Sequence, residues 1–155
     1  HHCIGNHDLF GWALAATNKE DGKKWAKDEY CLDHSYYSIQ KGKWKFLVLD
    51  SIHARHTIPG YFGKLDHKQL DWLEKELNST DNQTYICVVS HIPILSVCSM
   101  FDGNKHSDNN WFVPDNTLHA DAGILRDLFY KHLQVLLNNP ITRISLFHLL
   151  QLLLS

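Results

Sequence analysis

The fold class is decided by the stretch Trp44-Lys-Phe-Leu-Val-Leu-Asp-Ser51 and by a second stretch, Thr84-Tyr-Ile-Cys-Val-Val-Ser-His91. Both contain a continuous apolar run, which is typical of a strand that is buried on both faces of an α/β sheet. The first run ends at the loop residues Asp50 and Ser51, and the second is followed directly by His91. Because functional residues of open α/β sheets lie beyond the carboxyl ends of the strands, His91 is a candidate site residue.

The segments around the first run predict a hairpin and a break. Residues Tyr36–Gln40 precede the run across the turn Lys41-Gly42-Lys43, which predicts two strands joined by a tight, glycine-containing loop. After the run, Gly60-Tyr-Phe-Gly63 is expected to interrupt regular structure.

A helix is predicted from Asp66 to Leu77. The Asp66 side chain can accept a hydrogen bond from the backbone N–H of Gln69 while Gln69 reaches back, which is a capping-box arrangement. One apolar face is expected at helical spacing from Leu70, Leu73 and Leu77.

A second helix is predicted from Asp121 to about Leu137, ended by Asn138-Asn139-Pro140. Its apolar side is expected to consist of Ile124, Leu125, Leu128, Phe129, Leu133 and Leu136. Residues 96–120 have little periodicity, and a loop of this length inside a domain is usually functional. The order of strand, helix, strand and helix predicts an α/β fold.

The composition excludes several classes of protein. The chain has 155 residues, 44% hydrophobic and 21% charged, which fits one soluble folded domain rather than a disordered protein. The net charge of −2 lacks the basic surplus that a sequence-independent nucleic-acid binder needs. The apolar end Ile144–Ser155 is too short to span a bilayer. The cysteine spacing gives no disulfide framework, which predicts reduced or buried thiols.

Histidine is unusually frequent, with 12 residues against 8 glycines, which points toward metal or proton chemistry. The alternative is scattered surface histidines, and we expect most of the 12 to be of that kind. The block Gly5-Asn6-His7-Asp8 combines a residue suited to a sharp turn, a neutral oxygen ligand, a proton donor and a carboxylate. Alone, it fits a tight turn with an Asx hydrogen bond equally well. Ser90-His91-Ile92-Pro93 adds a histidine after a buried strand.

Taken in order, these motifs resemble the calcineurin-like metallophosphoesterases, and within them the bacterial cyclic-nucleotide-phosphodiesterase-like and purple-acid-phosphatase-like branch. The similarity runs from residue 3 to about residue 140. It rests on Gly5-Asn6-His7-Asp8, Tyr36-Tyr-Ser38, Phe46-Leu-Val-Leu-Asp-Ser51, Gly63-Lys-Leu-Asp66, Gln69-Leu-Asp-Trp-Leu73 and Val88-Val-Ser-His-Ile-Pro93. The resemblance implies an α/β fold in which a β-sandwich is flanked by helices, in α-β-β-α layers.

The same resemblance implies a two-metal centre that hydrolyses small-molecule phosphomonoesters or phosphodiesters with a metal-bridged hydroxide. Asn6 and His91 would bind one of two divalent ions, for which Mn, Fe or Zn suit the mixed ligands. His7 would assist the leaving group as a general acid or a hydrogen-bond donor. We expect Asp8 to orient the residues that contact metal or substrate.

The sequence also departs from the family pattern. The Asp-x-His and Gly-Asp blocks belong before Gly5, and the Gly-His-x-His block belongs after Pro140, where His148 lacks the other members. We therefore expect residues 1–140 to form an incomplete metallophosphoesterase domain and residues 141–155 an atypical apolar tail. With only Asn6 and His91 as ligands, the chain is predicted to bind metal weakly and to have little activity. The alternative is a non-catalytic fragment or pseudoenzyme that acts as a binding module.

Two further hypotheses concern other residues. Cys31-x-x-His34 and His53-x-x-His56 have zinc-like spacing and flank the predicted hairpin, so they could form a separate metal site. Candidates for a substrate-contacting wall are Trp12, the loop His53–Tyr61 and the long loop Ser96–Ala120.

Overall fold

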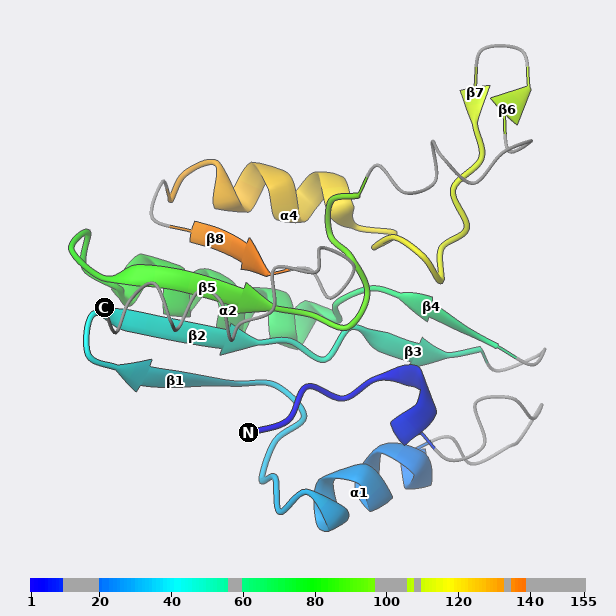
Figure 1. The fold of residues 1–155 in the computed structure, drawn as a ribbon, viewed down its shortest axis with the longest axis horizontal. Coiled ribbons are helices and arrows are strands. Elements are labelled where there is room, and N and C mark those ends of the chain that lie inside the picture. Colours follow the sequence, from blue (N-terminus) through cyan, green and yellow to red (C-terminus); the bar gives the residue numbers. More distant parts are fainter. Residues whose placement is uncertain (10–19, 56–59, 97–105, 108–109, 133–134, 139–155) are drawn as a thin grey trace, which may run out of the picture.

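The computed structural model describes residues 1–9, 20–55, 60–96, 106–107, 110–132 and 135–138. Its main sheet has four strands in the order β1-β2-β5-β8 (Figure 1). Strand β1 (Tyr37–Lys41) runs antiparallel to β2 (Trp44–Val48), whereas β2, β5 (Tyr85–Val89) and β8 (Val135–Asn138) are parallel. The mixed α/β fold class predicted from the sequence is confirmed at this level.

The smaller elements surround this sheet. The described helices are the 3-10 helix η1 (Asn6–Asp8), α1 (Glu20–Glu29), α2 (His67–Ser79) and α4 (Ala122–Phe129). Two antiparallel pairs lie outside the main sheet, β3 (Ile52–Ala54) with β4 (Tyr61–Gly63) and β6 (His106–Ser107) with β7 (Asn110–Trp111). Among these described helices, none has the length and apolar character needed to cross a membrane.

The predicted hairpin is confirmed. Lys41 pairs with Trp44, so Gly42 and Lys43 alone form the turn. Gly42 has φ of +58°, a conformation that glycine adopts without steric cost. This short turn fixes the register of β1 against β2 and leaves β5 to pair with the other edge of β2.

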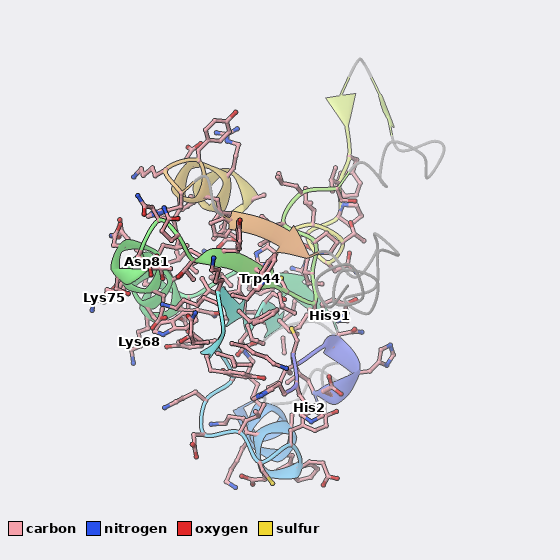
Figure 2. All side chains as sticks on the ribbon, turned by 60° about the vertical axis from the view of Figure 1, so that its left-hand side comes forward. His2, Trp44, Lys68, Lys75, Asp81 and His91 are labelled. Carbon is pink, nitrogen blue, oxygen red and sulfur yellow. The ribbon has the colours of Figure 1, made fainter. Side chains whose placement is uncertain are left out.

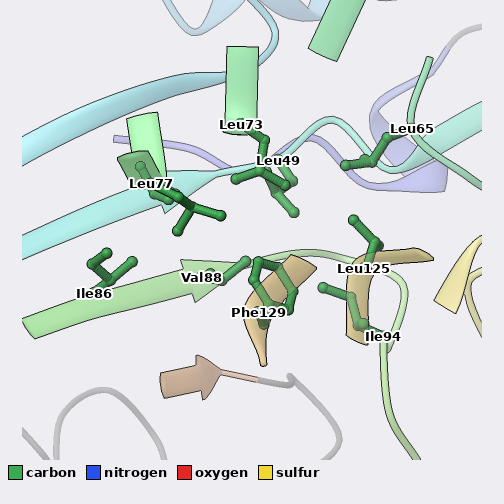
Figure 3. Close-up of a cluster of buried hydrophobic side chains, with 10 residues drawn as sticks. Leu49, Leu65, Leu73, Leu77, Ile86, Val88, Ile94, Leu125 and Phe129 are labelled. Atoms are coloured by element: carbon green, nitrogen blue, oxygen red, sulfur yellow. The ribbon is translucent and has the colours of Figure 1, made fainter. Parts of the chain in front are cut away.

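The hydrophobic core lies between the sheet and the helices α2 and α4. Figure 3 shows Leu73 and Leu77 from α2 facing Ile86 and Val88 from β5, with Phe129 from α4 in the same cluster. Both α2 leucines are fully buried, which confirms most of the apolar face predicted for this helix. Burial of a leucine side chain contributes about 1.5–3 kcal/mol, so this contact is the main reason why α2 lies on the sheet.

The start of α2 differs from the predicted capping box in one half. The Asp66 side chain accepts a hydrogen bond from the backbone N–H of Gln69 at 2.8 Å, as expected. Gln69 does not reach back to Asp66. Instead, its Oε1 accepts from the backbone N–H of Asp50 and its Nε2 donates to the Asp50 carbonyl, both at 2.9 Å. The backbone N–H and C=O of Asp50 are buried just after β2, so each needs a hydrogen-bond partner. The buried Gln69 side chain supplies both partners.

The second predicted helix is wrong in its C-terminal half. Helix α4 ends at Phe129, and the Val-Leu-Leu sequence that follows forms β8, which pairs with β5 from Ile86 to Val89. Ile124, expected on the apolar side, is 59% exposed. A short apolar run is compatible with a helix or a buried strand, and the free edge of β5 selects the strand.

The structure also bears on the predictions for residues 60–63 and for the long segment 96–120. Gly60–Gly63 was expected to be a break, but residues 61–63 form β4 because Ile52, His53 and Ala54 offer paired backbone groups. The long segment 96–120 contains the β6–β7 hairpin. Its residues 97–105 and 108–109, and the apolar tail at 141–155, lie outside the described residues.

Replacement of Gln69 tests the hydrogen bonds to the Asp50 peptide. We expect Gln69→Ala to lower the free energy of unfolding by about 2–4 kcal/mol, because it leaves a buried N–H and a buried C=O without partners. Urea denaturation followed by circular dichroism measures this change. Lys68→Ala, at an exposed position one residue earlier, is the control and should cost less than about 0.5 kcal/mol. Equal losses in the two variants would contradict the role given to Gln69.

Candidate functional site

The structure brings together the two residues predicted to bind one metal ion. His91 follows β5 and Asn6 begins η1, yet the Nε2 atom of His91 lies 2.9 Å from the Oδ1 atom of Asn6. In Figure 2, His91 lies beside the ribbon of η1, at the opposite side of the molecule from Lys75 and Asp81. The facing atoms are the two that ligation would use.

A glycine beneath the His91 ring makes this approach possible. A Cβ atom added to Gly5 would lie 2.8 Å from Nδ1 and 2.9 Å from Cε1 of His91. Both distances are shorter than real Cβ contacts allow. The glycine of the Gly5-Asn6-His7-Asp8 block is therefore required by side-chain packing, and its φ of −110° makes no special demand on the backbone.

Asp8 holds the block in its compact conformation. Its Oδ2 accepts a hydrogen bond from the Gly5 backbone N–H at 2.8 Å, and its Oδ1 accepts from the Tyr30 hydroxyl at 2.6 Å. The Tyr30 bond, together with nearby negative charge, raises the pKa of the phenol, so it stays protonated and donating. Asp8 thus ties the turn to the end of α1 and shapes the site without facing the Asn6–His91 contact directly.

The charge on His91 is controlled by its surroundings. Burial lowers the pKa of His91 below its usual value, the Asp8 carboxylate raises it in part, and the ring of His7 lowers it again. At neutral pH His91 is therefore a neutral imidazole, which is the form that binds metals. The side chain of His7 is exposed and lies within electrostatic range of His91.

The thiol of Cys3 lies next to these residues but is not activated. Burial, assisted by the charges of Asp50 and Asp8, raises the pKa of Cys3 to about 12. Its Sγ donates to the carbonyl of Leu49. Cys3, Cys31 and Cys87 are free, and Cys98 lies outside the described residues. Cys3 is a neutral packing residue at neutral pH.

Asp50 is a buried carboxylate that the sequence did not single out. Its Oδ2 forms an ion pair of 2.7 Å with Nζ of Lys23 from α1. Its Oδ1 is buried and has no hydrogen-bond partner among the described residues. The Nε2 atom of His53 is in the same state, and the charges of Lys23 and Asp50 both act on His53. This edge of the sheet therefore holds two buried polar atoms without a hydrogen-bond partner among the described residues.

A second network of buried polar residues was also missed. The Ser90 hydroxyl lies 3.1 Å from Nε2 of His119, whose Nδ1 lies 2.9 Å from the carboxylate of Asp121. The only sequence signals were the position of Ser90 after a strand and the spacing His-x-Asp. Neither reveals a contact over 29 positions.

The other predicted metal site receives no support from the described part of the chain. There, no group of three or more His, Cys, Asp or Glu side chains is arranged to hold an ion. Cys31 and His34 are exposed. His56, Trp12 and His148 lie outside the described residues.

The Asn6–His91 pair fits two positions of one divalent ion. Two adjacent ligands of an octahedral ion, with bonds of about 2.1 Å, lie about 3.0 Å apart. The observed separation of 2.9 Å is that of a hydrogen bond between the two atoms, and it also matches this spacing. An amide oxygen and a neutral imidazole are ligands that Mn, Fe and Zn accept. The pair would supply only part of a coordination shell.

Comparison with models of protein families, with curated proteins and with solved structures finds no match to this chain.

The contact between Gly5 and His91 can be tested by a double-mutant cycle. We expect Gly5→Ala to destabilise the chain by about 1–3 kcal/mol, because the added methyl group overlaps the imidazole ring. In the His91→Ala background the same change should cost less than about 0.5 kcal/mol. Urea denaturation of the four proteins gives the coupling free energy. A Gly5→Ala cost that is equal in both backgrounds would show that the ring does not lie over Gly5.

The half-buried His53 predicts a loss of stability in mild acid. Burial, together with the charge of Lys23, lowers the pKa of His53 below 6.5, although the carbonyl of Lys64 and nearby carboxylates oppose the shift. The stabilisation is therefore present above pH 6.5 and is lost as the pH falls through the lower folded-state value. We expect the decrease in unfolding free energy between pH 7.5 and pH 5.5 to be smaller in His53→Asn than in the wild type. The exposed variant His34→Asn serves as the control and should follow the wild type.

Proposed function

We propose that this chain is the ligand-bearing part of a metal-dependent phosphoesterase. The observation that supports the proposal is the contact between Oδ1 of Asn6 and Nε2 of His91 at 2.9 Å, across 85 positions of sequence. The resemblance to metallophosphoesterases assigns the same two residues to one ion. Two residues that bind the same ion must lie close together in the fold. Nothing in the local sequence of Asn6 or His91 brings them together, so their contact supports the proposal.

The proposed roles follow from the position of each side chain. Asn6 and His91 hold a divalent ion, and Asp8 keeps the turn of Asn6 in place through the Gly5 N–H. Bound metal ions of this kind supply Lewis acidity and lower the pKa of water. The exposed His7 donates a hydrogen bond or a proton to the leaving oxygen of a small phosphate ester. The finer architecture, a β-sandwich flanked by helices, belongs to this proposal.

A second candidate is a non-catalytic binding module. It is favoured by the ligand set that the resemblance assigns to this sequence, which is limited to Asn6 and His91. Catalysis by two metal ions needs more ligands than Asn6 and His91 provide. The two candidate functions differ in whether the chain hydrolyses phosphate esters. In both of them, Asn6 and His91 bind a metal ion.

Manganese titration of the isotope-labelled 155-residue chain tests the proposed ligands. We expect Mn²⁺ to broaden the nuclear magnetic resonance signals of the His91 ring and the Asn6 side-chain amide before those of other residues. His91→Ala should weaken this binding by about tenfold or more, because one of two ligands is lost. His34→Ala, at an exposed position, is the matched control. Broadening that is equal at His34 and His91 would contradict the assigned ligands.

Hydrolysis of p-nitrophenyl phosphate and of its bis ester separates the two candidates. We expect slow hydrolysis from this chain, because few ligands are present. Under the phosphoesterase proposal this slow hydrolysis depends on Mn²⁺ and is lost in His91→Ala. Metal binding without hydrolysis would favour the binding module.

A further inference from the structure

The turn that contains His91 is held by a buried polar network. The Ser90 hydroxyl donates to the carbonyl of Ile92 at 2.9 Å, and the Ile92 N–H donates to the hydroxyl of Ser51 at 3.1 Å. Ser51 lies just after β2 and Ser90 just after β5. The residues on both sides of His91 are therefore tied to the ends of the two central parallel strands.

His119 contacts this turn on both sides of His91. Its Nε2 lies 3.1 Å from the Ser90 hydroxyl, and its backbone N–H donates to the carbonyl of Pro93 at 3.0 Å. The imidazole is completely buried. A side chain and a backbone group of one residue thus contact the positions that precede and follow His91.

Asp121 fixes the orientation of the His119 ring. Its Oδ1 lies 2.9 Å from Nδ1 of His119, and its Oδ2 accepts from the Leu65 N–H at 2.9 Å. Burial by itself raises the pKa of Asp121, but the hydrogen bonds from His119 and Leu65 outweigh burial and hold it below its usual value. Asp121 precedes α4, yet its side chain makes no capping bond to that helix. The ionised carboxylate is used for the His119 contact.

The Ser90 hydroxyl takes part in two contacts of this network. Its hydrogen is directed at the Ile92 carbonyl, 2.9 Å away, and its oxygen lies 3.1 Å from Nε2 of His119. The other ring nitrogen of His119, Nδ1, faces the Asp121 carboxylate. Each ring nitrogen of His119 therefore has a polar partner.

Ser90, His119 and Asp121 have the connectivity of a nucleophilic triad but not its access. A serine nucleophile must reach a substrate carbonyl or phosphorus atom. Here Ser90 is 4% exposed, and the side chains of His119 and Asp121 are 0% and 2% exposed. We therefore assign this network a structural role and not a catalytic one. The nearest residue with a proposed chemical role is His91, which follows Ser90 directly.

We propose that His119, oriented by Asp121, is a positioning residue that fixes the turn of His91 through the Ser90 hydroxyl and the Pro93 carbonyl. The role rests on the proposed function, in which His91 binds a metal ion. Residues outside the ligand set that orient a ligand change metal affinity by about 10–100-fold when they are removed. His119 thereby couples the segment before α4 to the proposed metal site.

Substitutions that retain one hydrogen bond at a time test this role. Glutamine places a polar amide group where Nε2 of His119 faces Ser90, whereas asparagine places one only where Nδ1 faces Asp121. With Mn²⁺ as the probe, we expect His119→Asn and Ser90→Ala to weaken binding at His91 by about tenfold. His119→Gln should stay within about threefold of the wild type. Asn116→Ala, at an exposed position of the same segment, should have no effect. Equal affinity in all variants would overturn the proposal.

Two metal-free measurements separate this proposal from the proposed function. In His119→Asn we expect the Ile92 amide to exchange with solvent about tenfold faster, the effect of weakening one buried hydrogen bond. Nuclear Overhauser contacts between the His91 ring and Gly5 should weaken as well. If the wild type does not bind Mn²⁺, the proposed function fails, while these readouts still decide whether His119 positions His91. Covalent labelling of Ser90 by a fluorophosphonate would overturn the positioning role in favour of a nucleophile.

Discussion

The parallel pairing of β2 with β5 is the constraint on which the rest of the structure depends. It aligns Trp44 with Tyr85 and Val48 with Val89, and the ladder continues through the bond from Leu49 N–H to the Val89 carbonyl. The residues that follow the two strands therefore leave the sheet at one edge. Ser51 and Ser90 become neighbours of the same turn. Without this register, Asn6 would have no fixed partner in His91.

Buried polar side chains, rather than further apolar contacts, determine the geometry at that edge. Gln69 satisfies the Asp50 peptide, Ser51 satisfies the Ile92 N–H, and Asp121 satisfies the Leu65 N–H. Each of these backbone groups would cost about 1–3 kcal/mol if it were buried without a partner. Apolar packing tolerates small shifts of one element past another, whereas these hydrogen bonds require particular distances and directions. They explain how short loops can present side chains in fixed positions.

The sequence predicted the strands β1, β2 and β5, the helix α2 and the candidate ligand pair because each has a local signal. Leu73 and Leu77 repeat at helical spacing, and Gly42 fits a tight turn. The run from Val135 has no such signal, since three apolar residues suit a helix or a strand equally well. The free edge of β5 decides between them, and that edge exists only after β2 and β5 have paired. The role of Gln69 was missed for the same reason: its partner, the Asp50 peptide, lies 19 positions away.

By itself, the sequence determined the α/β class and the identity of Asn6, His7, Asp8 and His91 as candidate site residues. These features depend on residue type and short-range spacing, which a sequence records directly. Only the tertiary structure decided that Oδ1 of Asn6 faces Nε2 of His91, that Gly5 makes room for the ring, and that His119 lies behind the turn. Contacts of this kind join segments that are distant in sequence. They form only where sheet pairing and the burial of polar groups leave one arrangement with every partner satisfied.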